Sequence, residues 1–363
     1  MRIALVAPLV ERTPPLRYGG TERVVASLAD GLVARGHEVT LFATGDSASQ
    51  ARLVSAIDRA IWHDLDFRGE PGWPVARQLA QVLALQDQFD IIHSHVDYHL
   101  FPLLAGLGTL AVTTLHARLD LPEYRAVLRC FPYAPLVSIS DAQRTGVADL
   151  DLNWLGTIHH GIPPSEFTFS PDGGDYLAFL GRMSPEKGPE IAIRVAEEAG
   201  LKLRMAAKVP DGDREWFEQR VLPLLKHPGV EYIGEANEEQ KGELLRGARA
   251  LLFPARWPEP FGLTLIESLA CGTPVVALGV GSVPELLDDG VTGFVCSTAA
   301  EMVGACARLD TVSRRACRDS FEKDFTSDVM VDAYVALYER ALAEQPLPRE
   351  VAERMRRVGG LPV

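Results

Sequence analysis

The sequence has 363 residues, of which 47% are hydrophobic and 23% are charged, and its formal net charge is −13. This composition is that of an ordinary soluble globular protein, and the length predicts about two or three domains. The acidic balance argues against a broad nucleic-acid-binding surface but is compatible with a local basic pocket for phosphates. We therefore expect no nucleic acid among the partners.

Five cysteines lie along the chain, and none belongs to a C-x-x-C pair. An odd number of cysteines without such a pair favours free thiols in a reducing compartment, so we expect a cytoplasmic protein. The apolar start of the chain is short and is interrupted by Pro8 and Glu11, which favours a buried first strand over a signal peptide. No apolar segment approaches the ~20 residues that span a bilayer, and peripheral membrane contact stays open.

The first part of the chain alternates short apolar runs with amphipathic segments. The amphipathic segments predict helices, one that begins at Thr21 and one over residues 74–88. The apolar runs predict strands at residues 3–7, 37–43, 90–95, 111–116, 135–140 and 154–159. Residues 44–73 show no regular pattern, and Asp141 is expected to cap the helix that follows the fifth of these strands. The alternation predicts a parallel sheet that is covered on both faces.

A second alternating series follows residues 165–175, a polar segment that we interpret as a linker. Its strands are predicted at residues 176–181, 201–207, 230–234, 250–253, 275–277 and 293–296. Residues 325–343 predict an amphipathic helix whose apolar stripe consists of Val329, Ala333, Leu337 and Ala341. The whole pattern predicts an α/β fold with two Rossmann-like domains, residues 1–168 and 169–325, followed by a terminal helix and tail in residues 326–363.

The most informative stretch is residues 253–277, which read FPARWPEPFGLTLIESLACGTPVVA. A buried strand is followed by a proline-containing loop, and a helix then begins at Phe261-Gly262-Leu263. The first amides of a helix have no partner inside it and carry partial positive charge, and Gly262 lets a ligand approach the backbone closely. Glu259 and Glu267 bracket this helix start with seven residues between them. Helix amides together with two carboxylates suit a nucleotide sugar.

Two cations occupy the loop that follows the strand predicted at residues 176–181. The loop reads GRMSPEKG and contains Arg182 and Lys187. Arginine can grip phosphate oxygens as a fork, and lysine acts as a mobile point charge. Two cations at the carboxyl edge of a sheet therefore predict a phosphate site. Gly19-Gly20, at the start of the first helix, also offers bare amides to an anion, although the G-x-G-x-x-G dinucleotide fingerprint is absent.

Histidines gather at the carboxyl ends of the predicted strands of the first domain, where ligands bind in open α/β sheets. They are His93, His95, His116, His159 and His160. One interpretation is a zinc site with His93, His95 and His116 as ligands. The other is that these side chains form hydrogen bonds with the surrounding chain.

Taken together, these motifs resemble those of glycosyltransferase family 4, a family of retaining enzymes with the GT-B fold. The resemblance rests on E-x7-E at Glu259 and Glu267, G-R-x4-K-G at residues 181–188, the Gly-Gly turn, and the T-x-H pattern that ends at His116. It spans nearly the whole chain. It implies a GT-B architecture, with a cleft between an acceptor-side domain and a donor-side domain, and a terminal helix that crosses back to the first domain.

The resemblance also implies a role for each of the residues singled out above. The groups that would bind the leaving diphosphate are Arg182, Lys187, Gly19 and Gly20. The groups that would contact the donor sugar are the catalytic residues His116 and Glu259 and the backbone amides of Phe261, Gly262 and Leu263. Glu267 would accept hydrogen bonds from the ribose hydroxyls.

The activity implied is retaining transfer of a hexose from a nucleotide-diphosphate sugar, with UDP-glucose as the first expectation. The acceptor is not identified by the sequence, because its contacts would come from variable loops such as residues 8–18, 44–73 and 117–130. Alternatives that stay open are a nucleotide-sugar epimerase or hydrolase and a non-catalytic sensor. A glycosidase could use the two glutamates, but Arg182 and Lys187 would have no role in that reaction.

We expect neither a metal nor a cofactor. D-x-D triplets occur at residues 64–66, 149–151 and 211–213, but none directly follows an apolar strand. They are interpreted as solvated acids, and Asp288-Asp289 as an acidic helix end. No pattern in the sequence indicates an oligomeric state.

Overall fold

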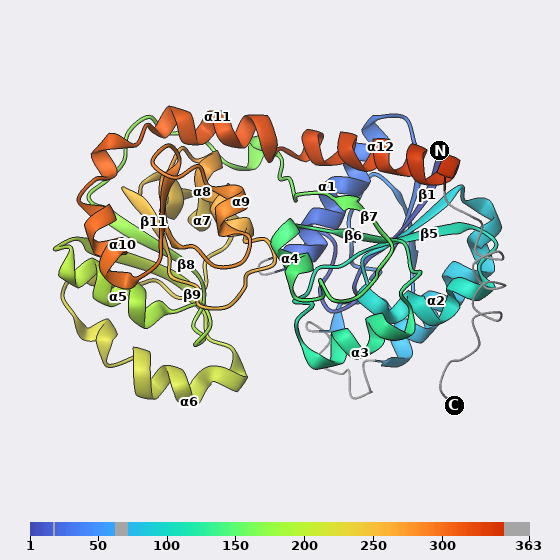
Figure 1. Cartoon of the computed structure of the whole chain (residues 1–363), viewed down its shortest axis with the longest axis horizontal. Coiled ribbons are helices and arrows are strands. Elements are labelled where there is room, and N and C mark those ends of the chain that lie inside the picture. The colour runs from blue at the N-terminus through green and yellow to red at the C-terminus, as the bar shows by residue number, and fades with distance from the viewer. Residues whose placement is uncertain (17–18, 62–71, 345–363) are drawn as a thin grey trace. The chain divides into compact units, whose positions relative to one another are not determined.

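The structure is a computed structural model, and it describes residues 1–16, 19–61 and 72–344. The chain divides into two compact units. Unit 1 contains residues 1–161 and the segment that begins at Ser327, and unit 2 contains residues 162–326. Each unit is built on one parallel sheet with helices packed on it (Figure 1). The α/β class predicted from the sequence is therefore confirmed.

The unit 1 sheet has seven strands in the order β3-β2-β1-β4-β5-β6-β7, and all neighbouring pairs are parallel. The strands are β1 Arg2–Val6, β2 Glu38–Ala43, β3 Arg52–Ser55, β4 Ile91–Ser94, β5 Leu110–Thr114, β6 Leu136–Ser138 and β7 Trp154–Thr157. The central strands β4, β5 and β6 are buried throughout, because helices cover both faces. Strand order reverses between β1 and β4, as in a doubly wound Rossmann-like sheet.

Strand β3 lies within residues 44–73, for which no regular structure was predicted, so that prediction is wrong for Arg52–Ser55. The strand is at the edge of the sheet and pairs only with β2 in the described part of the chain. Two of its four residues are exposed. An exposed edge strand needs few apolar side chains, which is why its sequence lacks the pattern of a buried strand.

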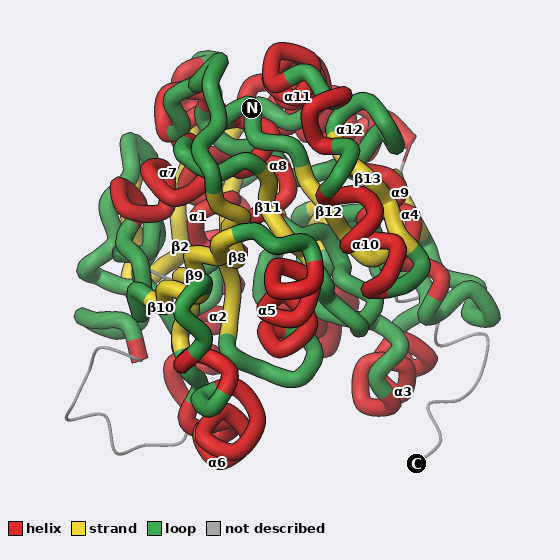
Figure 2. Tube along the Cα trace, turned by 90° about the vertical axis from the view of Figure 1, so that its left-hand side faces the viewer, coloured by secondary structure: helices red, strands yellow, loops and turns green. Residues whose placement is uncertain are grey.

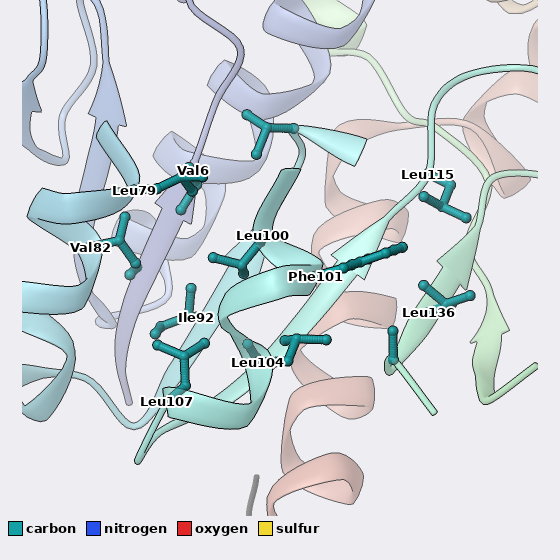
Figure 3. Packing of buried hydrophobic residues seen from close by; sticks show 14 of the residues in the cluster. Val6, Leu79, Val82, Ile92, Leu100, Phe101, Leu104, Leu107, Leu115 and Leu136 are labelled. Carbon is teal, nitrogen blue, oxygen red and sulfur yellow. The ribbon is translucent and has the colours of Figure 1, made fainter. Parts of the chain in front are cut away.

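The helices of unit 1 are α1 Gly20–Ala34, α2 Gly72–Leu85, α3 Pro122–Cys130, α4 Asp141–Thr145 and α12 Ser327–Glu344, with a 3₁₀ segment at Asp97–Gly106. The 3₁₀ segment and α2 supply side chains to one apolar cluster on the sheet, among them Leu79, Leu100 and Phe101 (Figure 3). Helix α4 is capped by Ser140, whose hydroxyl accepts a hydrogen bond from the Gln143 backbone N–H at 3.0 Å. The expected cap, Asp141, is instead the first helical residue.

The terminal helix α12 packs on α1 and β7 of unit 1 (Figure 1). A glycine permits this approach, since a Cβ at Gly31 of α1 would lie 2.6 Å from Val331 Cγ2. The predicted apolar stripe is wrong at Val329, which is 39% exposed. The buried residues are Met330, Val331, Tyr334, Leu337, Tyr338 and Ala341. Tyr334 and Tyr338 can be buried because their hydroxyls form hydrogen bonds with side chains of the sheet, Thr114 of β5 and His93 of β4 respectively.

The unit 2 sheet has six parallel strands in the order β10-β9-β8-β11-β12-β13. They are β8 Tyr176–Arg182, β9 Lys202–Lys208, β10 Val230–Tyr232, β11 Ala250–Phe253, β12 Val275–Leu278 and β13 Gly293–Cys296. The helices are α5 Pro189–Glu198, α6 Arg214–Trp216, α7 Glu238–Arg246, α8 Leu263–Ala270, α9 Val283–Leu286, α10 Ala299–Cys306 and α11 Arg314–Asp324. Helices α5 and α10 contact each other and the sheet, α7 and α8 do the same, and α11 packs on α8 (Figure 2).

All five cysteines are free thiols, and Cys130 is the exposed one. Burial raises the pKa of Cys271 to about 12 and that of Cys306 to about 11, so these thiols are unreactive at neutral pH. Among the helices of the described ranges, none combines the length and the apolar character that a bilayer span requires.

Candidate functional site

The strand order of the unit 2 sheet reverses between β8 and β11. In open parallel sheets, ligands bind beyond the carboxyl ends of the strands at such a reversal. Two loops begin at this place, residues 183–188 after β8 and residues 254–262 after β11. Gly188 lies so close to the second loop that a Cβ on it would be 2.6 Å from the Pro254 carbonyl oxygen. The two informative motifs of the sequence therefore form one site within unit 2.

An ion pair joins the two loops, with Lys187 Nζ against Glu259 Oε2. The two side chains are only 15% and 11% exposed, so solvent screens their attraction weakly. The indole Nε1–H of Trp257 donates to the same carboxylate oxygen at 2.7 Å. Trp257 was not predicted as a site residue, because nothing in a proline-containing loop indicates which carboxylate an indole will contact.

Arg182, the second predicted cation, lies beside the same indole. Its guanidinium carbon is 5.9 Å from the centroid of the Trp257 ring, and Lys187 Nζ is 4.9 Å from it. Arg182, the last residue of β8, also pairs with Glu186 of the loop that follows, with 3.0 Å between Nη2 and Oε1. Both cations are thus held at the carboxyl end of the sheet, each with one carboxylate partner.

Glu267 occupies the buried face of α8 and pairs with a different lysine. Its Oε1 accepts a hydrogen bond from Lys241 Nζ at 2.8 Å, and the side chains are 3% and 10% exposed. Lys241 also pairs with Glu238 at 2.7 Å and lies 5.4 Å from the centroid of the Phe167 ring. Lys241 was not predicted, because its partner is 26 residues away and no local pattern relates the two.

The start of α8 is fixed by a glycine at its N-cap and by hydrogen bonds from Ser282, in the loop that follows β12. Gly262 is the N-cap residue, and its φ of 88° places it in the left-handed region that glycine adopts most readily. The cap has no side-chain hydrogen bond, so the first amides of the helix are not covered by a capping side chain. Phe261 is buried, so it can serve a ligand only through its backbone. Ser282 holds this segment from the next loop: its N–H donates to Glu259 O at 3.0 Å and its hydroxyl to Phe261 O at 2.6 Å.

Gly19 and Gly20 begin α1 in unit 1, as predicted from the sequence. A Cβ on Gly19 would lie 2.8 Å from Pro15 Cβ and 3.1 Å from Glu22 Oε2, so a larger residue does not fit there. Burial raises the pKa of Glu22 to about 7. A carboxyl group that titrates near neutrality therefore lies at this helix start, where the sequence predicts that an anionic ligand binds.

His116 lies two residues beyond the end of β5, among other histidines of unit 1. Its Nε2 is 2.9 Å from His95 Nδ1, and its ring is stacked on His160 with 5.2 Å between centroids. Burial lowers the pKa of His116 to about 3, so the ring is neutral at physiological pH. Asp97, which the sequence did not indicate, has a left-handed φ of 47° and accepts the His116 backbone N–H at 3.1 Å. No described hydrogen bond joins His116 to Gly19 or Gly20.

The zinc interpretation has no ligand set in the structure. His93 uses both ring nitrogens, Nδ1 with the Tyr338 hydroxyl at 2.6 Å and Nε2 with the Thr114 hydroxyl at 2.7 Å. No group of three His, Cys, Asp or Glu side chains within the described ranges could hold a metal ion. The D-x-D acids at 149 and 211 form surface ion pairs with Arg125 and Arg214, and the triplet at 64–66 lies outside the described residues.

Family models match both halves of the chain. A glycosyltransferase family 4 model matches residues 18–165, and a glycosyl transferases group 1 model matches residues 165–309. The second match contains both loops of the unit 2 site.

The chain belongs to glycosyltransferase family 4.

This family 4 glycosyltransferase is 26% identical to the D-inositol 3-phosphate glycosyltransferase of Mycolicibacterium smegmatis, over 96% of this chain and 94% of that protein. It is 25% identical to AviGT4, a glycosyltransferase involved in avilamycin A biosynthesis, with a TM-score of 0.72 over 94% of this chain and 98% of that one. HepE from Anabaena, solved with UDP-glucose, is 17% identical with a TM-score of 0.71 over 94% of this chain and 100% of that one. The chain is thus a transferase enzyme with the GT-B fold, as the sequence predicted.

Proposed function

We propose that this enzyme transfers a hexose from a nucleotide-diphosphate sugar to a hydroxyl group of a small-molecule or glycan acceptor, with retention of anomeric configuration. The observation that carries the proposal is the Lys187–Glu259 ion pair at the strand-order reversal of unit 2. It brings a cation suited to phosphate into contact with a carboxylate suited to sugar hydroxyls. A pyrophosphate-linked sugar presents both kinds of group on neighbouring atoms.

Each predicted residue of unit 2 has a role in donor binding under this proposal. Lys187 and Arg182 neutralise the diphosphate, and the backbone amides of Phe261, Gly262 and Leu263 at the start of α8 add hydrogen-bond donors. Glu259 accepts a hydrogen bond from a sugar hydroxyl. Glu267 accepts hydrogen bonds from the ribose. Unit 2 is therefore the donor side of the enzyme in our proposal.

The reaction needs stabilisation of a leaving group more than it needs a strong base. The bond between the anomeric carbon and the β-phosphate oxygen breaks, and the electron pair goes to the diphosphate. The acceptor oxygen forms its bond to the same face of the anomeric carbon, and its proton passes to the departing phosphate oxygen. Arg182 and Lys187 stabilise the charge that develops on the diphosphate, so two side-chain cations supply the role that a divalent metal has in other transferases.

For unit 1 we propose the acceptor side, with its loops choosing the acceptor. The proposal retains His116 as a residue that contacts the donor sugar and Gly19 and Gly20 as diphosphate-binding turns. The neutral His116 ring can donate or accept a hydrogen bond but carries no charge to the reaction. The free thiols support the cytoplasm as the place where the enzyme works.

A UDP-sugar, first of all UDP-glucose, is the proposed donor. HepE, which shares the fold, binds UDP-glucose. The Mycolicibacterium smegmatis relative is a D-inositol 3-phosphate glycosyltransferase. Together they support a nucleotide-sugar donor and an acceptor rich in hydroxyl groups for this chain.

Removing either member of the ion pair tests the proposal directly. Lys187→Ala and Glu259→Ala should each lower kcat/KM for transfer by roughly 100-fold or more, since each removes a group that stabilises the transition state. Lys202→Ala is a matched control, because its lysine pairs with Asp175 on the surface of the same unit and is 66% exposed. Near-normal turnover in both site variants, with native circular dichroism, would overturn the assignment.

A thermal-shift panel of nucleotides and nucleotide sugars identifies the donor, because a ligand that binds only the folded state raises Tm. UDP and UDP-glucose should raise Tm more than the ADP and GDP equivalents. Product analysis by NMR, with and without acceptor, then separates transfer from hydrolysis or epimerisation. A β-linked product from an α-linked donor would contradict retention.

A further inference from the structure

Trp257 interacts with three charged side chains of the unit 2 site, Glu259, Lys187 and Arg182. We propose that Trp257 is a positioning residue for sugar transfer: its N–H fixes the Glu259 carboxylate, and its ring holds Lys187 and Arg182. It does not touch the reacting atoms. The role rests on the proposed function, because it concerns groups that bind the nucleotide sugar.

The indole N–H determines which carboxylate oxygen of Glu259 is available. Both hydrogen bonds that the structure gives this carboxylate, from Trp257 Nε1 at 2.7 Å and from Lys187 Nζ, go to Oε2. Two donors on one oxygen prevent the carboxylate from rotating freely. Oε1 is therefore left as the acceptor for a sugar hydroxyl, and its direction is set before the donor binds.

The indole ring attracts the cationic side chains of Lys187 and Arg182. Lys187 Nζ lies 4.9 Å from the ring centroid and Arg182 Cζ lies 5.9 Å from it, both within the range of cation–π attraction. Two like charges near one point repel each other, and the electron-rich ring face offsets part of that repulsion. The ring therefore keeps both cations near one place, where a diphosphate can meet them together.

The surroundings of Trp257 argue against a role in packing alone. The side chain is half-buried, and its sequence neighbours Arg256 and Pro258 are exposed. The residue is not among the buried hydrophobic core of the described chain. A substitution at this position should therefore leave unit 2 folded.

The two functions of the indole can be separated by substitution. Trp257→Phe removes the N–H and keeps an aromatic ring, whereas Trp257→Leu removes both. We expect Trp257→Phe to weaken UDP-glucose binding about 10-fold and to leave UDP binding within 2-fold, because Glu259 contacts the sugar and not the nucleotide. Trp257→Leu should weaken both ligands about 10-fold, since the cations also lose their support. Isothermal titration calorimetry measures both dissociation constants without requiring an acceptor.

A double-mutant cycle shows whether Trp257 acts through Glu259. In a Glu259→Gln background, Trp257→Phe should change UDP-glucose affinity by less than 2-fold, because the oriented carboxylate is already gone. Trp216→Phe, on α6 of the same unit, serves as the control and should match wild type. Circular dichroism and Tm establish that every variant is folded.

The outcomes separate this role from the proposed function. If wild-type protein binds UDP-glucose but Trp257→Phe binds it equally well, the positioning role is wrong and the donor site stands. Equal losses for UDP and UDP-glucose in Trp257→Phe, or the same loss in both Glu259 backgrounds, would also overturn it. If wild-type protein binds no nucleotide sugar, the proposed function itself fails.

Discussion

The proton position on His116 is decided by its neighbour His95. Both rings are neutral because burial lowers the pKa of each, so each carries one proton. His95 Nε2 is buried and has no hydrogen-bond partner in the described part of the structure. A buried N–H without a partner is rarer and more costly than a bare acceptor, so the His95 proton belongs on Nδ1. His95 then donates to His116 Nε2, and the proton of His116 lies on its Nδ1.

We therefore predict that His116 is an Nδ1–H tautomer at pH 7, able to donate from that atom. The ¹⁵N chemical shifts of histidine-labelled protein distinguish the two neutral tautomers. A His116→Gln variant assigns the signals, because it removes those of His116 alone. An Nε2–H form of His116 would show that the hydrogen bond runs in the opposite direction.

The Lys241–Glu267 pair predicts a stability effect that is separable from ligand binding. Lys241→Met removes a buried partner of the Glu267 carboxylate and should lower the free energy of unfolding by about 3 kcal/mol. The Lys241→Met/Glu267→Leu double variant should recover most of this loss, because no buried charge remains, but it should not bind UDP. Urea unfolding measures the first effect and calorimetry the second. A single variant as stable as wild type would show that the pair is not a structural necessity.

At the scale of elements, the site depends on a tight turn between β12 and α9. Gly281 has a φ of 64°, and a Cβ on it would press on the backbone N of Glu259 and lie 2.5 Å from its O. The loop after β11 is therefore placed by the loop after β12. This contact explains how residues distant from the ion pair can control its geometry.

Gly281→Ala should displace the Glu259 loop, abolish UDP-glucose binding and destabilise the protein by about 1–3 kcal/mol. Gly290→Ala is the matched control, because Gly290 has a φ of 77° but no heavy atom within 4 Å of the added Cβ. The control should lose only about 1 kcal/mol, the cost of a left-handed alanine, and should bind donor normally. Equal behaviour of the two variants would mean that backbone strain, and not the close approach, matters at Gly281.

At the scale of the whole molecule, the buried histidines make the two units differ in their response to acid. Burial lowers the pKa of His93 and His116 to about 3 and those of His95 and His160 well below the usual value. Below about pH 6.5 the unfolded chain binds protons that folded unit 1 does not, so the free energy of unfolding falls as the pH falls. The slope is about 1.4 kcal/mol per pH unit for each such histidine.

We predict that unit 1 unfolds first on acidification, between about pH 6 and pH 4. The described part of unit 2 contains only one histidine, the partly exposed His227, so it lacks this source of acid sensitivity. Hydrogen exchange with mass spectrometry resolves the two units in one experiment. Simultaneous loss of protection in both units at the same pH would contradict the prediction.

Two buried carboxyl groups of unit 1 act in the opposite direction. Burial raises the pKa of Glu22 to about 7 and also raises the pKa of Asp97. A raised carboxyl pKa means that the folded state binds the proton more tightly, so these groups lower stability as the pH rises toward neutrality. The histidines outnumber them and titrate below pH 6.5, so acid sensitivity of unit 1 is the net result.

The local pattern of apolar and polar residues was sufficient to predict most of the strands and helices. The predicted bounds of β11 and β13 match the structure, because a continuous apolar run between turn residues is itself the signal of a strand buried on both faces. The pattern failed at Arg52–Ser55 and at Val329, where sheet pairing or tyrosine hydrogen bonds decide burial. Such partners are distant in the chain, so no local window contains them.

By itself, the sequence determined the fold class and which residue types stand at the sheet edges, since alternating strands and helices and the residues that follow them are local properties. The tertiary structure alone decided which charged side chains pair with each other. Lys187 pairs with Glu259, 72 residues away in the chain. Glu267 pairs with Lys241, which was not a predicted site residue. It also showed Trp257 beside Lys187, Arg182 and Glu259. Pairing depends on strand order, which brings β8 next to β11, and strand order is a property of the folded sheet rather than of any segment.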